Sequence, residues 1–385
     1  MDRPGGRPGD VDAVSAALDP QHRSGVVAVR AHRHRAGLLR PFVTSARRTE
    51  AVEYVVVEVE LEGGAVGQGS AAETIAVTGE DAQSILTTLT GPLTTALTGA
   101  RGSLTELSAL VAGAAPGASS ARAAADVALH DAWARDAELA LVELLGGDAD
   151  DHLESDMTIS LEDPAVMATR AQQAAEAGYR VLKIKLGQDI GEDRRRLDAV
   201  LEAVPSARLR LDANQGWQPR EAVSIISAFE ADGLPVDLVE QPVAAADLAG
   251  LASVREAVAT PIMADEAVWT AADAHRIIEA GAADLLNIKL AKTGGIREAL
   301  AIADTAHDAG LTCMVGAMME PRISVTAAAH VALAHPAITL IDLDSPDWFT
   351  THLPAGGYAI ESGRLRLCGG PGLGLEPLAA ADDPP

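Results

Sequence analysis

Aromatic residues and cysteines are scarce in this sequence. Only 3% of its 385 residues are aromatic, so the core has to be built from Ala, Val, Leu and Ile. The two cysteines, Cys313 and Cys368, are too few for a disulfide framework or a cysteine-based zinc site. Cys313 lies in the apolar stretch LTCMVG, which predicts a small buried side chain.

Long hydrophobic runs and an excess of positive charge are missing as well. No apolar run reaches the roughly 18 residues that a membrane-spanning helix needs, and the N-terminal segment has no apolar core of the signal-peptide type. We therefore expect a cytoplasmic protein with no membrane partner. The formal net charge of −25 argues against a nucleic-acid partner, because phosphate binding needs a basic surface.

The first part of the chain predicts an α+β domain. Residues 1–24 and the C-terminal tail are expected to be disordered. Within residues 25–150, the Val-rich segments 25–35 and 51–64 are typical of strands, and the stretch from about 80 to 145 is typical of helices. A polar, basic loop is expected between the two strands, at 36–50. The following stretch, 65–80, is rich in Gly, Ser and Thr.

Residues 151–350 have a different character, because eight short apolar segments alternate there with amphipathic ones. The residues that end seven of these segments recur every 24 to 28 positions, which is the length of a strand, a helix and two loops. This period predicts a closed parallel (β/α) barrel. An open doubly wound sheet is the alternative, but no glycine-rich phosphate turn follows the first strand. The recurring residues are Lys185, Asp212, Glu240, Asp265, Lys289, Gly316 and Asp342.

No helix is expected after the eighth strand. Residues 351–385 are instead predicted to form strands and turns that return to the first domain, ahead of the disordered tail. The fold class is therefore α/β, with a (βα)7β modified TIM barrel and an N-terminal α+β domain that the C-terminal segment completes.

Three acidic residues end neighbouring strands of this predicted barrel. Asp212, Glu240 and Asp265 follow strands three, four and five, at the end where barrel enzymes place their active sites. Three carboxylates in a partly buried site need a divalent cation, and oxygen ligands favour Mg²⁺ or Mn²⁺ over zinc. The alternative, helix caps or solvated loop acids, would have to apply at three successive strands.

Lysines stand on either side of the acids. Lys183 and Lys185 share a face of strand two, and Lys289 ends strand six, which lies opposite in an eight-stranded barrel. The alternative is that these lysines only extend their ammonium groups from the barrel rim. A lysine acts as a base only when neutral, so its pKa must fall below about 10.4. A neighbouring ammonium and the cation would lower it, a role that suits Lys183 beside Lys185.

One base on each face of a metal-bound carboxylate predicts racemisation or epimerisation. Removing the α-proton gives an enediolate whose charge the metal stabilises, and the proton can return on the other face. With a leaving group at the β-position, the same residues would catalyse elimination.

Six segments of the sequence resemble one known family. KIKLG, LDANQGW, VEQPV, MADEAVW, NIKLAKTGGI and CMVGAMME are similar to the muconate-lactonizing-enzyme subgroup of the enolase superfamily, and the similarity extends from about residue 25 to 375. It implies an α+β capping domain over a (βα)7β barrel. It also implies Asp212, Glu240 and Asp265 as Mg²⁺ ligands, Lys185 and Lys289 as the acid/base pair, Lys183 as an electrostatic aid, and Asn214 and Glu266 as residues that support the ligands.

The segment IDLDSP, residues 341–346, resembles the Asp-x-Asp signature of dipeptide epimerases. In that subgroup the pair, here Asp342 and Asp344, holds the free ammonium of a dipeptide while the metal holds its carboxylate. Two fixed carboxylates are a good ammonium site. The alternative is a capping Asp beside a turn Asp before Pro346.

The segment RPFVTSARRTE resembles the stretch where Ala-Glu epimerases carry an arginine for the glutamate side chain. The similarity places that arginine at Arg47, with Arg48 next to it. It implies an L-Ala-L/D-Glu-like substrate, whereas the alternative is a solvated basic loop.

The sequence therefore predicts a Mg²⁺-dependent dipeptide epimerase, an isomerase that we expect to form a homo-oligomer. An N-acylamino acid racemase, a muconate-type cycloisomerase and an o-succinylbenzoate synthase remain alternatives. A metal-dependent binding protein without activity is disfavoured, because binding alone needs no acid/base pair.

Overall fold

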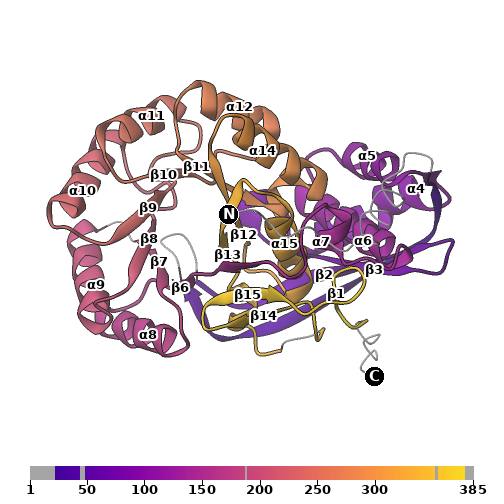
Figure 1. Cartoon of the computed structure of the whole chain (residues 1–385), viewed down its shortest axis with the longest axis horizontal. Helices are drawn as coiled ribbons and strands as arrows, with labels where there is room; N and C mark the ends of the chain where they lie inside the picture. Colours follow the sequence, from indigo (N-terminus) through magenta and orange to yellow (C-terminus); the bar gives the residue numbers. More distant parts are fainter. Residues whose placement is uncertain (1–21, 44–47, 187–188, 352–353, 378–385) are drawn as a thin grey trace.

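The computed structural model describes residues 22–43, 48–186, 189–351 and 354–377. Figure 1 shows a barrel ringed by helices beside a second domain that contains the N-terminal strands. Nearly all of the predicted leader and all of the tail from residue 378 lie outside the described residues. None of the described helices is long and apolar enough to cross a membrane.

The N-terminal domain is built on an antiparallel sheet with the strand order β3-β2-β1-β4. Val55, Val57 and Val59 of β2 are fully buried, as expected for one face of a strand that packs on helices. The strands are β1 (Ser24–Val43), β2 (Arg48–Leu61), β3 (Val66–Ala72) and β4 (Arg101–Gly102).

Two features of this sheet differ from the sequence-based expectations. The loop predicted at 36–50 is wrong, because β1 continues to Val43 and pairs with β2 up to Val43–Arg48, with an irregular register between Gly37 and Phe42. β3 falls in the Gly/Ser/Thr-rich stretch, where no strand was expected. Its Gly67 and Gly69 let helix α6 (Ser119–Asp136) approach closely, since a Cβ on Gly69 would lie 1.9 Å from a backbone oxygen of that helix.

Further helical segments complete this domain, and α6 is the longest. It packs across β2 and β3, and its side chains from Ser119 to Ala134 are almost all buried. The others are α2 (Ile75–Thr78), α3 (Ala82–Thr88), the π-helical segment η1 (Leu89–Leu93), α4 (Thr94–Leu97), α5 (Leu104–Ala114) and α7 (Leu141–Leu144).

The barrel consists of eight parallel strands that neighbour one another in chain order. All eight predicted strands are present. They are β6 (Met157–Ile159), β7 (Val181–Lys185), β8 (Arg208–Asp212), β9 (Val236–Glu240), β10 (Ile262–Ala264), β11 (Leu285–Lys289), β12 (Thr312–Gly316) and β13 (Ile338–Asp342).

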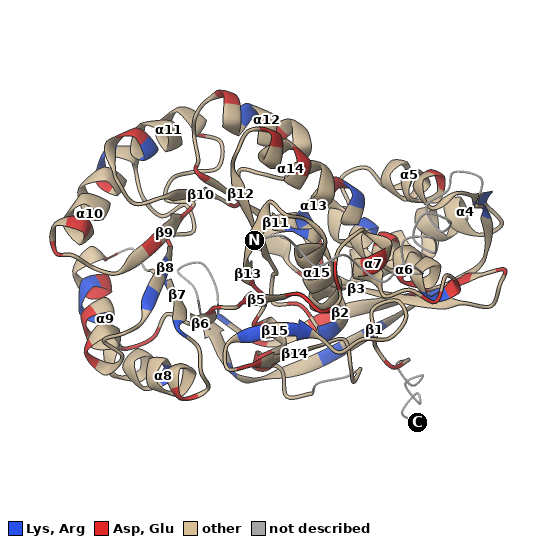
Figure 2. Ribbon diagram, viewed as in Figure 1, with Lys and Arg blue, Asp and Glu red and all other residues tan. Residues whose placement is uncertain are grey.

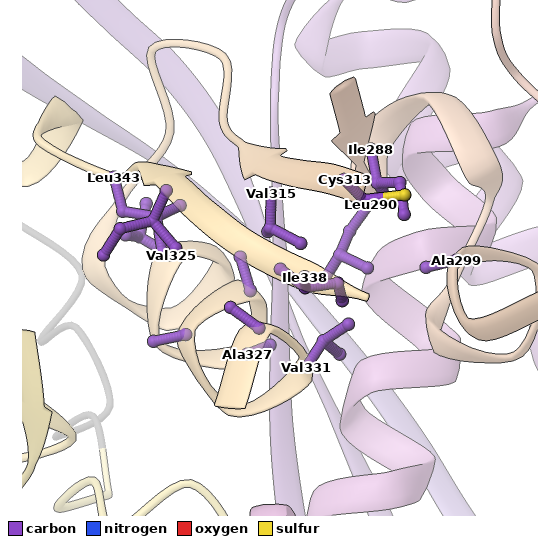
Figure 3. Close-up of a cluster of buried hydrophobic side chains, with 14 of the residues drawn as sticks. Ile288, Leu290, Ala299, Cys313, Val315, Val325, Ala327, Val331, Ile338 and Leu343 are labelled. Carbon is purple, nitrogen blue, oxygen red and sulfur yellow. The ribbon is translucent and has the colours of Figure 1, made fainter. Parts of the chain in front are cut away.

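Helices cover the outer face of these strands and bury it. Val315 of β12, Ile338 of β13 and Val331 of α15 meet in one such layer (Figure 3). Cys313 lies in the same layer, which confirms that it is a buried small side chain. The helices are α8 (Pro164–Glu176), α9 (Ile190–Ala203), α10 (Pro219–Ala231), α11 (Leu248–Ala257), α12 (Ala271–Glu279), α13 (Leu290–Thr293), α14 (Ile296–Asp308) and α15 (Arg322–Ala334).

The inside of the barrel is apolar in one layer and charged in others. Leu238, Met263 and Met314 form a small apolar cluster. The buried ion pair between Arg210 and Asp156, 2.7 Å apart, also lies among the strands, and Arg210 donates to a backbone oxygen of β13 as well. Alternation along each strand decides which side chains enter the barrel: on β7, Lys183 and Lys185 face inward, while Leu182 and Ile184 face the helices.

After β13 the described residues form no eighth barrel helix. It makes the short 3₁₀ helix η2 (Ser345–Trp348) and then the hairpin of β14 (Tyr358–Glu361) and β15 (Arg364–Leu367), which pairs with β5 (His152–Glu154). The segment then returns to the first domain, where the amide of Leu141 donates to the carbonyl of Gly372 at 2.7 Å. The predicted (βα)7β barrel, with a C-terminal segment that returns to the N-terminal α+β domain, is confirmed.

Candidate active site

A cavity of about 360 Å³ lies at the carboxyl ends of the barrel strands. Phe42 of β1 and Val77 of α2 line it, so the N-terminal domain supplies part of its wall. Met319, in the loop after β12, lines it from the barrel side. Figure 2 shows acidic and basic positions on the strands that surround this cavity, among them β7, β8 and β9.

The three predicted acidic residues end neighbouring strands as expected. Lys185, Asp212 and Glu240 lie side by side on β7, β8 and β9, and Asp265 comes directly after β10. Each of the three carboxylate residues is at most 3% exposed. Buried charges of one sign require positive partners.

Lys183 is surrounded by carboxylates. Its Nζ lies 2.6 Å from Oε2 of Glu240, 2.6 Å from Oδ2 of Asp342 and 3.3 Å from Oδ2 of Asp212. One ammonium therefore links the acids of β8 and β9 with the Asp-x-Asp segment at the end of β13.

Lys185 and Lys289 approach the acids from opposite sides of the barrel. Nζ of Lys185 lies 2.5 Å from Oδ2 of Asp212. Nζ of Lys289 lies 2.6 Å from Oδ2 of Asp265 and 3.9 Å from Oε1 of Glu240. Both lysines line the cavity.

The lysines decide which of the buried acids is ionised. Burial alone would raise the pKa of Asp212, but Lys185 and Lys183 lower it to about 2. Glu240 behaves differently, because burial and the negative charge of Asp212 raise its pKa to about 7. Glu240 is therefore the acid whose charge depends most on an additional cation.

The contacts that lower the pKa of an acid raise the pKa of the lysine that makes them, as Asp265 and Lys289 show. Burial would raise the pKa of Asp265, yet Lys289 and Lys292 hold it well below its usual range. Burial would lower the pKa of Lys289, yet Asp265 and Glu240 raise it above the ordinary value. Lys183 shifts upward in the same way. The side chains alone thus keep Lys289 and Lys183 as ammonium groups, contrary to the lowered lysine pKa that a base needs.

The acidic residues suit a hard cation, although they do not form a ready cage. Within the described parts of the chain, no group of three or more His, Cys, Asp or Glu side chains is placed to hold a metal ion, because lysine ammonium groups lie between the carboxylates. Oε2 of Glu240 is buried, and Nζ of Lys183 lies 2.6 Å from it as an ion-pair partner. Three neighbouring carboxylates supply the hard oxygen donors that Mg²⁺ favours. The residues therefore fit such an ion once the flexible lysines turn aside.

Asp342 and Asp344 both line the cavity, but only Asp342 belongs to a strand. Asp344 starts the turn into η2, and its Oδ2 accepts a 2.6 Å hydrogen bond from the amide of Thr158 on β6. Burial and the nearby charge of Asp342 raise the pKa of Asp344 to about 6. The pair thus lies in the cavity wall at the place where β6 and β13, the first and last strands of the barrel, meet.

Two family models match the chain. Residues 27–146 match the N-terminal domain of the mandelate racemase/muconate lactonizing enzymes, and residues 166–381 match the enolase C-terminal domain-like model. This chain belongs to the mandelate racemase/muconate lactonizing enzyme family. The predicted membership in this branch of the enolase superfamily is confirmed.

Members of this family with known activities are similar along almost the whole chain. An L-Ala-D/L-Glu epimerase of Bacillus subtilis is 41% identical, over 91% of this chain and 96% of its own. An N-succinyl-L-Arg/Lys racemase of Bacillus cereus is 32% identical, over 91% and 95%.

A solved structure of an Enterococcus faecalis dipeptide epimerase, complexed with Mg and the dipeptide L-Leu-L-Tyr, superposes with a TM-score of 0.86. It is 37% identical, and the match covers 91% of this chain and 99% of that one. Given these relatives, this member of the mandelate racemase/muconate lactonizing enzyme family is an isomerase of the racemase and epimerase type.

Of the remaining predicted site residues of this family member, some contact the acids of the site and others do not. Asn214 donates from its backbone to Oδ1 of Asp212 at 2.9 Å, and its side chain lies 3.4 Å from Glu266. Arg47 lies outside the described residues, so its contact with substrate stays a prediction. Arg48 is exposed and pairs with Glu50.

Sequence reasoning missed three polar residues that hold the acids of this site. Gln241 accepts hydrogen bonds from the amides of Asp265 and Ala267, while Asn287 and Lys292 contact acids directly. Asn287 could have been found, because it precedes Lys289 by two residues on one strand and therefore shares its face.

Proposed function

We propose that this protein is a Mg²⁺-dependent epimerase of dipeptides. One arrangement supports the proposal: Lys185 and Lys289 face the same cavity from opposite strands, and the Asp342–Asp344 pair lines that cavity as well. The two lysines suit inversion at a carbon atom, and the acidic pair suits a substrate with a free ammonium group.

In this proposal, Asp212, Glu240 and Asp265 hold the metal ion, with Mn²⁺ as a possible substitute. When bound, Mg²⁺ would neutralise the substrate carboxylate and stabilise the negative charge that develops there as the α-proton leaves. Asn214 supports this group through its backbone contact to Asp212, and Glu266 accepts a hydrogen bond from the Asn214 side chain.

Lys185 and Lys289 exchange the proton. β7 and β11 are four strands apart in a barrel of eight, so their side chains approach a bound substrate from opposite faces. The neutral lysine removes the α-proton from one face, and the opposite ammonium returns a proton to the other. Lys183, between Glu240 and Asp342, remains an ammonium and provides positive charge near the substrate carboxylate.

Asp342 and Asp344 would bind the substrate ammonium. Asp344 can use Oδ1 for this contact, because Oδ2 is engaged by Thr158. Asp342 shares its Oδ2 with Lys183 at 2.6 Å, so the ammonium would compete with that lysine. An L-Ala-L/D-Glu-like dipeptide is the first substrate to test, and Arg47 is the proposed contact of its glutamate side chain.

The N-acylamino acid racemase is the second candidate, since a relative that carries such a name is 32% identical. A substrate with an acylated nitrogen has no ammonium and would leave the two aspartates unpaired, which costs binding energy. The acidic pair in the cavity wall therefore favours the dipeptide.

The Asp342→Asn/Asp344→Asn double variant distinguishes the two candidates. We expect kcat/KM for L-Ala-L-Glu to fall by about 100-fold or more, because hydrogen bonds to charged groups contribute roughly 1.5–3 kcal/mol each. The double variant should turn over N-succinyl amino acids at least as fast as the wild type does. The matched control is Asp347→Asn, an exposed residue of the same segment that does not line the cavity. Equal turnover of the dipeptide by the double variant and the wild type would refute the ammonium site.

A further inference from the structure

Lys292 is a buried cation for which the proposed reaction has no role. It lies in α13, three residues after Lys289, and its side chain is 0% exposed. Its Nζ donates to Oδ1 of Asp265 at 2.6 Å, to the carbonyl of the same residue, and to the carbonyl of Asn287 at 3.1 Å. Its three donors are thus matched by three acceptors, all of them protein atoms.

The carboxylate of Asp265 is divided between two lysines. Oδ1 accepts from Lys292, whereas Oδ2 accepts from Lys289 at 2.6 Å. Lys289 is among the described residues that line the cavity, and Lys292 is not. Only Oδ2 is therefore on the side that a substrate or an ion can reach.

Asn287 likewise engages one of the two carboxylate oxygens of Glu240. Its side-chain amide donates to Oε1 of Glu240 at 2.8 Å, whereas the buried Oε2 faces Nζ of Lys183 at 2.6 Å. Lys292 holds the carbonyl of Asn287. One short segment, residues 287–292, thus fixes one oxygen on each of two acids and carries Lys289 between the two contacts.

The choice of lysine at this position is informative. The whole sequence contains four lysines, at 183, 185, 289 and 292, and its other 26 basic Lys/Arg positions are arginines. Surface ion pairs such as Arg23–Glu106 use arginine. A lysine ammonium is compact, whereas a guanidinium is planar and larger. At this buried position the chain thus carries the smaller cation, whose three donors match the three acceptors around it.

We infer that Lys292 is a positioning residue that orients Asp265 for the metal ion. It keeps Oδ1 engaged permanently, so that Oδ2 faces the ion when Lys289 turns away. Asn287 does the same for Glu240. This inference rests on the proposed metal-dependent function, but it predicts a property that can be measured without substrate.

Removing Lys292 has two opposite effects on metal binding. Loss of its positive charge would tighten the binding of a cation, whereas loss of the anchor would let Asp265 rotate and weaken it. Partners that hold a metal ligand typically contribute about 10- to 100-fold to metal affinity. Orientation therefore dominates, and the sign of the change identifies the role.

The test is isothermal titration calorimetry of Mg²⁺ into the wild type and into Lys292→Met and Lys292→Gln. We expect Kd to rise by about 10-fold or more in Lys292→Met. Lys292→Gln retains an amide donor and should lie between Lys292→Met and the wild type. At saturating Mg²⁺, kcat should return to within a few-fold of the wild type, since Lys292 is not among the described residues that line the cavity.

Lys289→Met is the matched control, because it removes the other lysine from the same carboxylate. Its affinity for Mg²⁺ should be unchanged or higher, while epimerisation is lost. Unchanged or tighter Mg²⁺ binding by both Lys292 variants overturns the positioning role alone. A wild type that binds no Mg²⁺ overturns the proposed function and this inference together. Lys292→Gln keeps the test decisive if Lys292→Met does not fold.

Discussion

At the scale of single residues, the site is a set of buried charges that hold one another. Lys183 contacts three carboxylates, and the two lysines that face each other across the cavity also contact acids of the proposed metal site. These contacts keep Lys289 charged. A bound cation would take over its role as counter-ion and release it for proton transfer.

The types and strand positions of these residues could be predicted from the sequence, because carboxylates and lysines at barrel strand ends are costly without a partner. The contacts between them could not. Which oxygen of Asp265 binds Lys289 and which binds Lys292 depends on side-chain rotamers. The role of Gln241 could not be predicted for another reason. Its side chain binds backbone amides after β10, in a segment 24 residues away.

The opposed lysines predict a stereochemical difference between two variants. Lys185→Ala and Lys289→Ala should each reduce epimerisation by about 10³-fold or more, because general acid–base catalysis contributes on the order of 10² to 10⁴. Each variant should still exchange the α-proton of the one diastereomer that its remaining lysine can reach. Proton NMR in D₂O, run separately from the L,L and L,D dipeptides, measures both effects.

Mg²⁺ titration is the control for these variants, because neither substitution removes a proposed ligand and the metal should still bind. Epimerisation at an undiminished rate in either variant would contradict the two-base mechanism.

At the scale of elements, strong patterns were predicted well and context-dependent ones were not. The barrel strands were found because each is a short apolar run with a regular spacing. The extension of β1 to Val43 was not predicted. It depends on pairing with β2 and on contacts with the barrel, such as the bridge between Leu38 and Phe349. β3 was not predicted, because Gly67 and Gly69 weaken the strand pattern of its sequence. The same two glycines permit the close approach of α6.

One buried histidine connects three elements and sets a pH limit on stability. His330 of α15 accepts at Nδ1 from the amide of Val142 in α7, at 3.0 Å, so Nε2 carries the proton and faces the carbonyl of Leu373 at 3.4 Å. Burial lowers the pKa of His330 from 6.5 to about 4. The unfolded chain therefore binds a proton before the folded chain does.

The free energy of unfolding should consequently fall as the pH falls from about 6.5 to 4, and the loss should be complete below pH 4. This one group accounts for roughly 2–3 kcal/mol between pH 7.5 and 4.5. His330→Gln keeps a donor and an acceptor but does not titrate, so its loss over this range should be smaller by that amount. Urea unfolding at both pH values measures the difference.

His275→Gln, an exposed residue of α12, is the matched control and should behave like the wild type. An identical pH dependence in His330→Gln and the wild type would show that another group is responsible.

At the scale of the whole molecule, the two domains share one function. The barrel provides the acids and lysines, and the N-terminal domain provides Phe42 and Val77 to the cavity wall. This division explains why the acids and lysines of the cavity could be predicted from the sequence and the preferred substrate could not. Acids and lysines at strand ends follow from a repeat, whereas the wall that contacts the substrate side chain combines residues far apart in the chain.

The most direct measurement is proton NMR of the purified protein with Mg²⁺ and L-Ala-L-Glu in D₂O, extended to other dipeptides such as L-Leu-L-Tyr. We predict loss of the α-proton signal of the C-terminal residue and the appearance of the L,D diastereomer, both dependent on Mg²⁺. α-Proton exchange in no dipeptide of the series, by a protein that binds Mg²⁺, would contradict dipeptide epimerisation.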